Sequence, residues 1–406
     1  MSQSFAQNIL SETLKKDFSV VNFVRYLVED AFCSNVSDIH LHPTEKNIRI
    51  RFRIDGLLRD VALLPSKFFP EVVARIKILS NLRIDEQKNS QDGRFRHVLS
   101  STNGKNDFFD VRVSFVPTFH GESIVLRLLA QTFSSVSLSD LGFSDQDEEK
   151  ILNCINKQSG MILVTGPTGS GKTTTLYTLI KMLNTKERSV VTIEDPIEYS
   201  VSDTKQIQTN PRVGLNFANG LRSILRQDPD IIMVGEIRDL ETAQIAVNTA
   251  LTGHLLLSTL HTIDSVTAIP RLLDMGVLSF LVASTLRLVI AQRLVRKICV
   301  NCKKEKVLSF VEIELFRKNY DYDLKKTWYG AGCEVCKFTG YLGRMVVCEV
   351  LVVNDSIREL IVSNSEIIKI KKTAIDSGLN ILIKDGIKKV ESGFITIEEL
   401  FRCLNE

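Results

Sequence analysis

Helical and strand-like patterns of apolar residues follow one another in the first third of the chain. From Phe18 to Phe32 the apolar residues recur at helical spacing, which predicts an amphipathic helix. From Ile48 to Gly56 apolar and charged residues alternate before a turn, which predicts a strand with one buried face. We therefore expect a tail over residues 1–17 and an α+β domain over residues 18–130.

The pattern changes after residue 130. Residues 131–140 are mostly polar and lack strong periodicity, which is typical of a linker. Beyond them, helical stretches separate apolar runs near residues 161–165, 190–194, 230–234 and 254–260. Strands that alternate with helices indicate an α/β sheet, so we expect an α/β domain over residues 141–406. Within it, residues 339–406 are expected to be a helical C-terminal part.

Composition narrows the classes of protein. A chain of 406 residues with 44% apolar content is long enough for two or three domains. Its formal net charge of +3 is too small to favour nucleic acid or an anionic membrane as the main partner. The N-terminus lacks a basic flank followed by an apolar core, so we expect no secretory signal. The longest apolar stretch, residues 279–295, contains Arg287 and Arg293 and is too short to span a membrane, so we expect a cytoplasmic protein.

The clearest chemical signal is the segment Gly-Pro-Thr-Gly-Ser-Gly-Lys-Thr, which lies between a predicted strand and a predicted helix. Its glycines permit a tight backbone whose N–H groups point at phosphate oxygens, and the following helix adds the positive end of its dipole. Lys172 is expected to reach the β- and γ-phosphates, and the Thr173 hydroxyl to ligate Mg²⁺. We therefore expect a nucleoside triphosphate to bind at Gly166, Pro167, Thr168, Gly169, Ser170, Gly171, Lys172, Thr173 and Thr174.

Two acidic segments could complete this site, because phosphoryl transfer needs groups that hold the metal and orient or deprotonate water. The apolar run that begins at residue 190 ends in three carboxylates, Glu194, Asp195 and Glu198, at the sheet edge where α/β proteins bind ligands. The run over residues 228–239 has Gly235 where many P-loop enzymes have an aspartate, which leaves Mg²⁺ contact through water to Glu236. Taken alone, either segment is better explained as solvated charge at the end of a strand than as part of an active site. Because a complete phosphate loop is present as well, a role in holding the metal or activating water is favoured.

His254 and His261 flank the predicted strand over residues 255–260. A histidine at the end of a buried strand could sense the γ-phosphate through a hydrogen bond, or it could cap the sheet, and the sequence leaves both open.

Four of the eight cysteines form two close pairs, Cys299/Cys302 and Cys333/Cys336. Two Cys-x2-Cys pairs can present four thiolates to one tetrahedral Zn²⁺, which is the pattern of a closed structural site. Nearby lysines would offset part of its negative charge. We expect a zinc element over residues 297–338; buried or redox cysteines are the alternative. Four isolated cysteines are expected to pack as small apolar residues: Cys33, Cys154, Cys348 and Cys403.

These segments together resemble the type II secretion/type IV pilus ATPase family. In the predicted α/β domain the resemblance rests on the phosphate loop and on residues 192–198, 220–239 and 252–262. In the predicted N-terminal domain it rests on residues 37–43, 51–56, 91–94 and 120–129, which are similar to the family's N2 domain. It covers essentially residues 18–406.

The resemblance implies a RecA-like P-loop ATPase domain behind a PAS-like N2 domain, ATP as the nucleotide, and a homo-hexameric ring. It implies that Glu198 is the general base, that Glu236 helps to hold Mg²⁺, and that His261 is the second histidine of a histidine box. The N2 domain would supply Arg112 and Arg127 to the phosphates, because a guanidinium stabilises charge on the transferring phosphoryl group.

Other arginines are weaker candidates for the phosphates. Arg94 is a weaker third candidate from the N2 segment. Arg222 and Arg226 are four residues apart on one predicted helical face and could serve the same phosphate or pair with nearby acids. Arg112 and Arg127 could themselves be ordinary exposed strand arginines.

The tetracysteine element resembles that of the secretion and assembly branch, which favours extension or secretion over retraction. Secretion members usually carry a substantial domain before N2, whereas about 17 residues precede it here, so contact through N2 or the C-terminal domain is expected. The resemblance thus implies a cytoplasmic motor at the inner face of the membrane, held by partners, that acts on an inner-membrane platform protein. The rival functions are a retraction motor, a nucleic-acid motor and a nonhydrolysing scaffold; the low net charge argues against nucleic acid.

Overall fold

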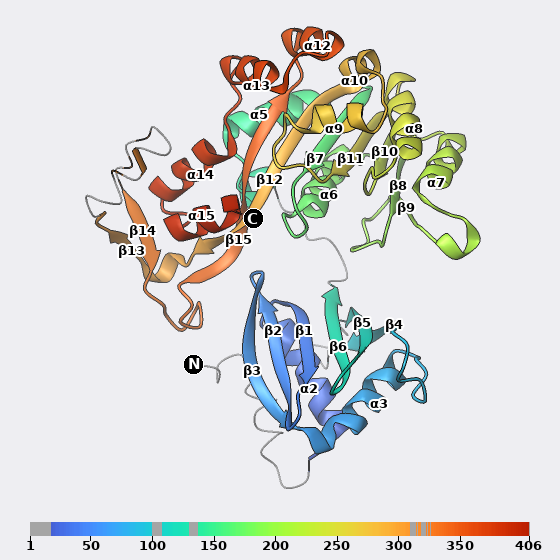
Figure 1. Cartoon of the computed structure of the whole chain (residues 1–406), viewed down its shortest axis with the longest axis vertical. Coiled ribbons are helices and arrows are strands. Elements are labelled where there is room, and N and C mark those ends of the chain that lie inside the picture. Colours follow the sequence, from blue (N-terminus) through green and yellow to red (C-terminus); the bar gives the residue numbers. More distant parts are fainter. Residues whose placement is uncertain are drawn as a thin grey trace. The chain divides into compact units, whose positions relative to one another are not determined.

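The computed structural model describes residues 18–99, 108–129, 137–308, 314, 316–317, 322, 324 and 326–405. The predicted tail over residues 1–17 and most of the predicted linker, residues 131–136, lie outside the described part. The described residues form two compact units (Figure 1). The first takes in those between Met1 and Thr132 together with Cys333–Phe338, and the second those of Phe133–Gly332 and Thr339–Glu406.

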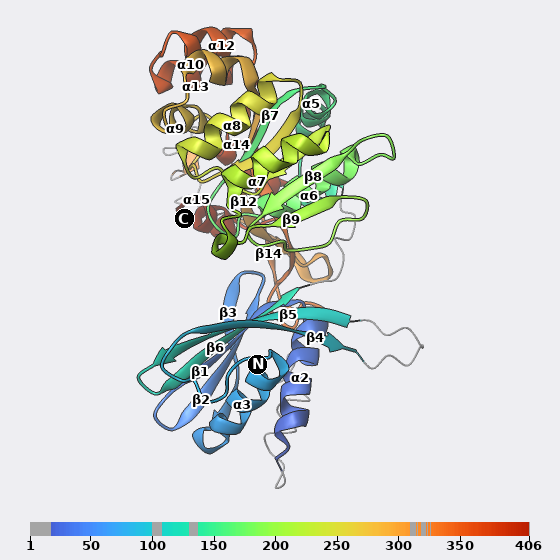
Figure 2. The ribbon, with the colours of Figure 1, turned by 90° about the vertical axis from the view of Figure 1, so that its right-hand side faces the viewer.

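The first unit is an antiparallel sheet with two helices against one of its faces (Figure 2). The helix predicted from Phe18 is confirmed as α2 (Val20–Cys33), and Ser19 caps it by accepting a hydrogen bond from the N–H of Asn22. The second helix is α3 (Phe69–Leu79). The strands lie in the order β3-β2-β1-β6-β5-β4: Leu57–Pro65, Asn47–Ile54, Val36–Pro43, Gly121–Leu129, Phe108–Thr118 and Gln91–Val98.

Alternation along these strands separates the two faces of the sheet. Buried residues such as Ile50, Phe52 and Val111 pack with Phe23 and Leu27 of α2 in one apolar core. The residues between them, many of them arginines, point to the other face, as the alternating pattern of residues 48–56 predicts.

The second unit contains a seven-stranded sheet in the order β15-β12-β7-β11-β10-β8-β9. Six of these strands run parallel, and β15 pairs antiparallel with β12 at the edge. The four strands predicted from apolar runs are confirmed as β7, β8, β10 and β11. The bounds, in sheet order, are Tyr341–Val352, Leu286–Ile298, Gly160–Thr165, Leu255–Leu260, Ile231–Val234, Val190–Glu194 and Lys205–Gln208.

Helices cover both faces of this sheet, as expected for the α/β class. Along β7, Met161 and Leu163 face one apolar core while Ile162 and Val164 face the other. The core that contains Met161 and Leu163 includes residues of α7 (Phe217–Ile224), α8 (Leu240–Leu251), α9 (Ala268–Asp274), α10 (Ser279–Thr285), α12 (Asp355–Val362) and α13 (Ile367–Asp376). The core that contains Ile162 and Val164 includes residues of α4 (Leu138–Leu141), α5 (Asp145–Ile155) and α6 (Lys172–Leu183).

The C-terminal segment is less helical than expected. Residues 339–406 begin with β15, whose run of seven consecutive buried residues matches a strand covered on both faces. Helices α12 and α13 follow, and then α14 (Leu382–Glu391) and α15 (Ile397–Asn405), which pack on one further apolar cluster with Val295 and Val347. Strands β13 (Lys303–Lys306) and β14 (Thr327–Gly330) pair antiparallel in a separate two-stranded sheet. Among the described helices, none has the length and apolar character to cross a bilayer.

Candidate active site

The phosphate loop connects the carboxyl end of β7 to the first residue of α6. Gly166, Gly169 and Gly171 have φ values of 145°, 80° and 87°, a region that side chains disfavour. A Cβ on Gly166 would lie 2.5 Å from the carbonyl oxygen of Gln292, so strand β12 leaves no room for a side chain there. The loop therefore needs these glycines for its backbone path.

Lys172 begins α6 and turns its amino group back over this loop. Its Nζ donates to the carbonyl oxygens of Gly166 and Pro167, both at 2.9 Å. Burial lowers the pKa of Lys172 to about 8, although the carboxylates of Glu236 and Glu198 act in the opposite direction. The amino group thus lies over the phosphate loop, next to the N-terminus of α6.

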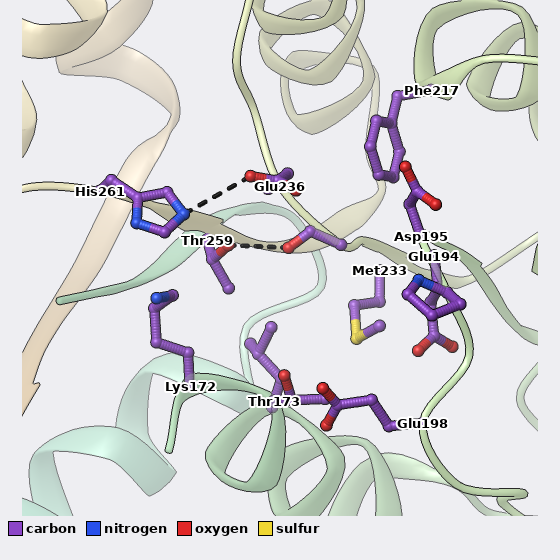
Figure 3. A pocket seen from close by; sticks show the side chains of 13 residues that line it. Lys172, Thr173, Glu194, Asp195, Glu198, Phe217, Met233, Glu236, Thr259 and His261 are labelled. Atoms are coloured by element: carbon purple, nitrogen blue, oxygen red, sulfur yellow. Dashed lines mark hydrogen bonds and ion pairs between the residues drawn. The ribbon is translucent and has the colours of Figure 1, made fainter. Parts of the chain in front are cut away.

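A cavity of about 130 Å³ opens beside this lysine, at the carboxyl ends of the parallel strands (Figure 3). Five of the residues predicted to bind or hydrolyse the nucleotide line it together: Lys172, Thr173, Glu198, Glu236 and His261. Figure 3 shows the Glu198 carboxylate pointing toward the Thr173 hydroxyl. The other lining residues are Leu176, Glu194, Asp195, Pro196, Phe217, Met233, Gly235 and Thr259.

The three carboxylates after β8 have different surroundings. Glu194 is 3% exposed, and it accepts hydrogen bonds from Thr192 Oγ1 at 2.7 Å, from Gln206 Nε2 at 3.0 Å and from the Tyr177 hydroxyl. Asp195 and Glu198 are exposed. A carboxylate enclosed by three donors is poorly placed to take a proton from water, so Glu198 is the better candidate for a base.

Glu236 follows β10 and lies between the side chains of Arg238 and His261. Its carboxylate is 2.5 Å from Arg238 Nη2 and 3.5 Å from His261 Nε2. Burial and the charge of Lys172 lower the pKa of His261, although the carboxylate of Glu236 acts to raise it. His261 follows β11 and faces the cavity, whereas His254 precedes β11 and directs Nδ1 to the Thr249 carbonyl oxygen at 3.2 Å. The two histidines therefore lie at opposite ends of one strand.

Arg222 and Arg226 are not among the residues that line this cavity. Arg222 Nη2 contacts Glu241 Oε1 at 2.8 Å, and Arg226 donates to the Arg222 carbonyl oxygen at 3.1 Å. The structure therefore has Arg222 paired with an acid of α8, one of the two alternatives left open by the sequence.

The N-terminal arginines form a row across the first unit's sheet. Arg94 of β4, Arg112 of β5 and Arg127 of β6 are partners in register, and Asp38 of β1 is the next position in the row. Arg127 Nε contacts Asp38 Oδ1 at 2.8 Å, while 62% of the Arg127 side chain stays exposed. The register thus gathers the three predicted arginines on one face, opposite the helices.

The four paired cysteines also lie together. The Sγ atoms of Cys299, Cys302, Cys333 and Cys336 are all within 4.8 Å of one another. The Sγ atoms of Cys333 and Cys336 are 3.7 Å apart, close to the ~3.8 Å between ligands of a tetrahedral zinc with ~2.3 Å zinc–sulfur bonds. The N–H of Gly332 donates to the Cys302 sulfur at 3.3 Å. Four converging sulfurs and a backbone donor fit zinc, which when bound would supply a rigid crosslink.

Sequence reasoning missed two residues that shape the site. Gln292 of β12 is fully buried beneath the phosphate loop, and Tyr177 of α6 is fully buried beside Glu194. A glutamine directly after the apolar run of residues 288–291 in β12 and a tyrosine on the inner face of the phosphate-loop helix were the available signals.

Comparison with known proteins gives a consistent result. A sequence model of the family described as "Type II/IV secretion system protein" matches residues 13–402. Type II secretion system protein E of Xanthomonas campestris pv. campestris is 43% identical over 394 residues, which is 97% of this chain and 69% of that protein. Type IV pilus assembly ATPase PilB of Acinetobacter baylyi is 40% identical over 398 residues, 97% of this chain and 68% of that protein.

A solved structure agrees with these relatives. The pilus retraction motor PilT with bound ADP has a TM-score of 0.62 and 27% identity, over 94% of this chain and 96% of that chain. The resemblance inferred from the motifs is thereby confirmed, as is the fold class. The chain belongs to the type II/IV secretion system protein family.

Proposed function

We propose that this chain is an ATP-hydrolysing hexameric motor that drives assembly of a type II secretion pseudopilus or a type IV pilus through an inner-membrane platform protein. The observation that carries the proposal is the cavity in which Lys172, Thr173, Glu198 and Glu236 meet beside a phosphate loop. Membership of a family that includes secretion and pilus assembly ATPases supports it.

Each residue around the cavity has a defined task in this proposal. The loop N–H groups and Lys172 bind the β- and γ-phosphates. Glu198 accepts a proton from a water molecule while the water oxygen bonds to the γ-phosphorus and the bond to the β–γ bridging oxygen breaks. Thr173 and Glu236 hold Mg²⁺, which when bound neutralises charge on the phosphates. His261 contacts the γ-phosphate in this proposal, and its Nε2 lies 3.5 Å from the Glu236 carboxylate.

The arginine row of the first unit stabilises the reacting phosphates in this proposal. Arg112 and Arg127 reach the phosphates of a bound nucleotide and stabilise charge as it moves onto the leaving group. Because they belong to a separate unit, hydrolysis depends on closure of that unit over the nucleotide. Nucleotide binding and release then change the shape of the ring, provided that its two conformations differ in ATP affinity.

The remaining partners follow from the family. The motor acts in the cytoplasm at the inner face of the membrane and is held there by the platform protein. The tetracysteine cluster binds zinc and braces the region around residues 297–338. It also favours assembly over retraction, since retraction motors typically lack it; a related retraction motor shares the fold.

The first experiment measures magnesium-dependent phosphate release by the purified chain. Lys172→Ala should abolish nucleotide binding, and Glu198→Gln should abolish turnover while ATP still binds. Asp203→Asn, an exposed carboxylate in the same connection after β8, is the matched control and should hydrolyse normally. A Glu198→Gln protein with normal turnover would remove Glu198 from the role of base.

Further measurements separate the rivals. Co-purification with a polytopic membrane protein supports the platform partner, and loss rather than excess of pili in a mutant separates assembly from retraction. Salt-dependent DNA binding with DNA-stimulated hydrolysis would instead favour a nucleic-acid motor. Absence of any turnover by the intact ring would favour a scaffold.

A further inference from the structure

A tyrosine of the phosphate-loop helix contacts the segment that carries the proposed base. Tyr177 lies in the middle of α6 and is fully buried, and its ring lies edge-on to that of Tyr199 with centroids 6.2 Å apart. Its hydroxyl donates a hydrogen bond to the carboxylate of Glu194 at the end of β8. Burial and the charge of Glu194 raise the pKa of Tyr177 well above its ordinary value, so this hydroxyl keeps its proton.

The connection after β8 also acts on this tyrosine. Hydrogen bonding from the backbone N–H groups of Glu198 and Tyr199 lowers the pKa of Tyr177, against the larger effect of burial, and the Tyr199 ring packs edge-on against its ring. One phenol oxygen therefore joins three groups: a carboxylate before the connection, and two amides within it, one of which belongs to Glu198 itself. A buried carboxylate or hydroxyl without a partner is costly, which keeps Tyr177 and Glu194 bonded to each other.

A second residue supports this connection from the other side. Gln206 of β9 donates to Glu194 Oε1 and to the Tyr199 carbonyl oxygen, both at 3.0 Å, and accepts from the N–H of Val201 at 2.8 Å. Glu198 thus has an exposed side chain on a backbone that is fixed on both flanks. An exposed carboxylate on a free loop would sample many positions, whereas this one starts from a fixed Cα.

We propose that Tyr177 is a positioning residue for hydrolysis: its hydroxyl holds the backbone of Glu198 so that the carboxylate faces the water that attacks the γ-phosphate. This inference rests on the proposed function of Glu198 as base. It connects the phosphate loop to that base through one helix, because α6 begins with Lys172 and Thr173, and Tyr177 lies five residues after Lys172. A helix that binds the phosphates therefore also sets the position of the base.

Tyr177→Phe tests the proposal because it removes the oxygen and keeps the ring. Misplacing a catalytic group by about 1 Å can lower a rate by roughly 100-fold, so we expect kcat to fall by about 10- to 100-fold. The KM for ATP and the Kd of a nonhydrolysable analogue should stay within about twofold, because the loop and Lys172 are untouched. Amides of residues 198 and 199 should exchange hydrogen faster, while those of α6 keep their protection.

Two matched variants separate positioning from general damage. Thr178→Val removes a buried hydroxyl from the same helix that donates to the Thr174 carbonyl oxygen at 2.9 Å, and it should leave kcat unchanged. Thr192→Val removes a donor to Glu194 without touching the Glu198 backbone and should have a smaller effect than Tyr177→Phe. If Tyr177→Phe fails to fold, Gln206→Leu loosens the same connection from its edge and should lower kcat in the same way.

The outcomes are distinct for the two proposals. If Glu198→Gln is inactive and Tyr177→Phe or Gln206→Leu lowers kcat with KM retained, both proposals stand. If Glu198→Gln is inactive while a folded Tyr177→Phe has normal kcat and normal exchange at residues 198 and 199, the positioning role is wrong and the base role survives. If Glu198→Gln turns over normally, the base role itself fails.

Discussion

Gln292 Nε2 donates a hydrogen bond to the carbonyl oxygen of Ser170 at 2.8 Å, which ties strand β12 to the middle of the phosphate loop. The other end of the same amide accepts from Thr175 Oγ1 at 2.9 Å. Because Gln292 is fully buried, both bonds form away from water. One side chain therefore fixes the loop against the helix that follows it.

Replacing Gln292 by Leu should weaken ATP binding. The change leaves the Ser170 carbonyl and the Thr175 hydroxyl without this partner, and loss of a buried hydrogen bond costs about 1–3 kcal/mol. We expect the Kd of a fluorescent ATP analogue to rise by about 5- to 100-fold. Gln244→Leu, on the exposed face of α8, is the control and should bind normally. An unchanged Kd for a folded Gln292→Leu protein would contradict this prediction.

Binding of ATP should be coupled to proton uptake at Lys172. With a pKa of about 8 in the free protein, this amine is roughly half deprotonated at pH 8. A triphosphate beside it favours the charged form, so binding raises the pKa and takes up a proton. Calorimetry at pH 8 in two buffers of different ionisation enthalpy should give an uptake of about half a proton per ATP, and affinity should fall as pH rises above 8.

The effect of pH on stability has the opposite sign to its effect on ATP affinity. Because the folded-state pKa of Lys172 lies below its ordinary value of 10.5, the unfolded chain binds more protons between about pH 8 and 10.5. The contribution of Lys172 to the free energy of unfolding therefore rises with pH across that window. Lys172→Met should remove this pH dependence of the free energy of unfolding, and a dependence that persisted in the variant would assign it to another group.

The parts of the site that follow one another along the chain could be predicted from sequence. The glycines of residues 166–173 predict the path of the phosphate loop, and the apolar runs predict the four strands. Gln292 and Tyr177 could not be predicted in the same way, because the bond from Gln292 to Ser170 joins residues 122 apart. Such a contact depends on β12 pairing with β7, which local patterns do not determine.

The strand at the edge of the sheet, β15, could not be predicted from the sequence either. Residues 341–352 form a strand that is buried on both faces, and a short apolar run of this kind does not distinguish a strand from a buried helix. Likewise, the sequence could not choose among Glu194, Asp195 and Glu198 on burial. That difference depends on Tyr177 and Gln206, which belong to α6 and β9.

Zinc should bind in a ratio of about one per chain at the four paired cysteines. Cys336→Ser should lower the zinc content measured by mass spectrometry of metals, and it should increase hydrogen exchange around residues 297–338. The phosphate loop does not include these residues, so the Kd for ATP should change by less than about twofold. Cys154→Ala, which removes an isolated buried cysteine from α5, should keep its zinc. A metal-free wild-type protein with normal exchange in this region would contradict the assignment.

The arginine row should act on a nucleotide held by another subunit. Arg112→Ala should lower kcat by about 10³-fold or more, the range for an arginine that stabilises the transferring phosphoryl group. Arg96→Ala is the matched control, since this exposed arginine pairs with Asp110 at 2.9 Å in a different row, and surface pairs contribute about 0–1 kcal/mol. Mixing Arg112→Ala with Glu198→Gln chains before ring assembly should restore up to about a quarter of the activity, because each variant supplies the group that its neighbour lacks. If no mixture regains activity while both variants assemble, the arginine serves the nucleotide of its own chain.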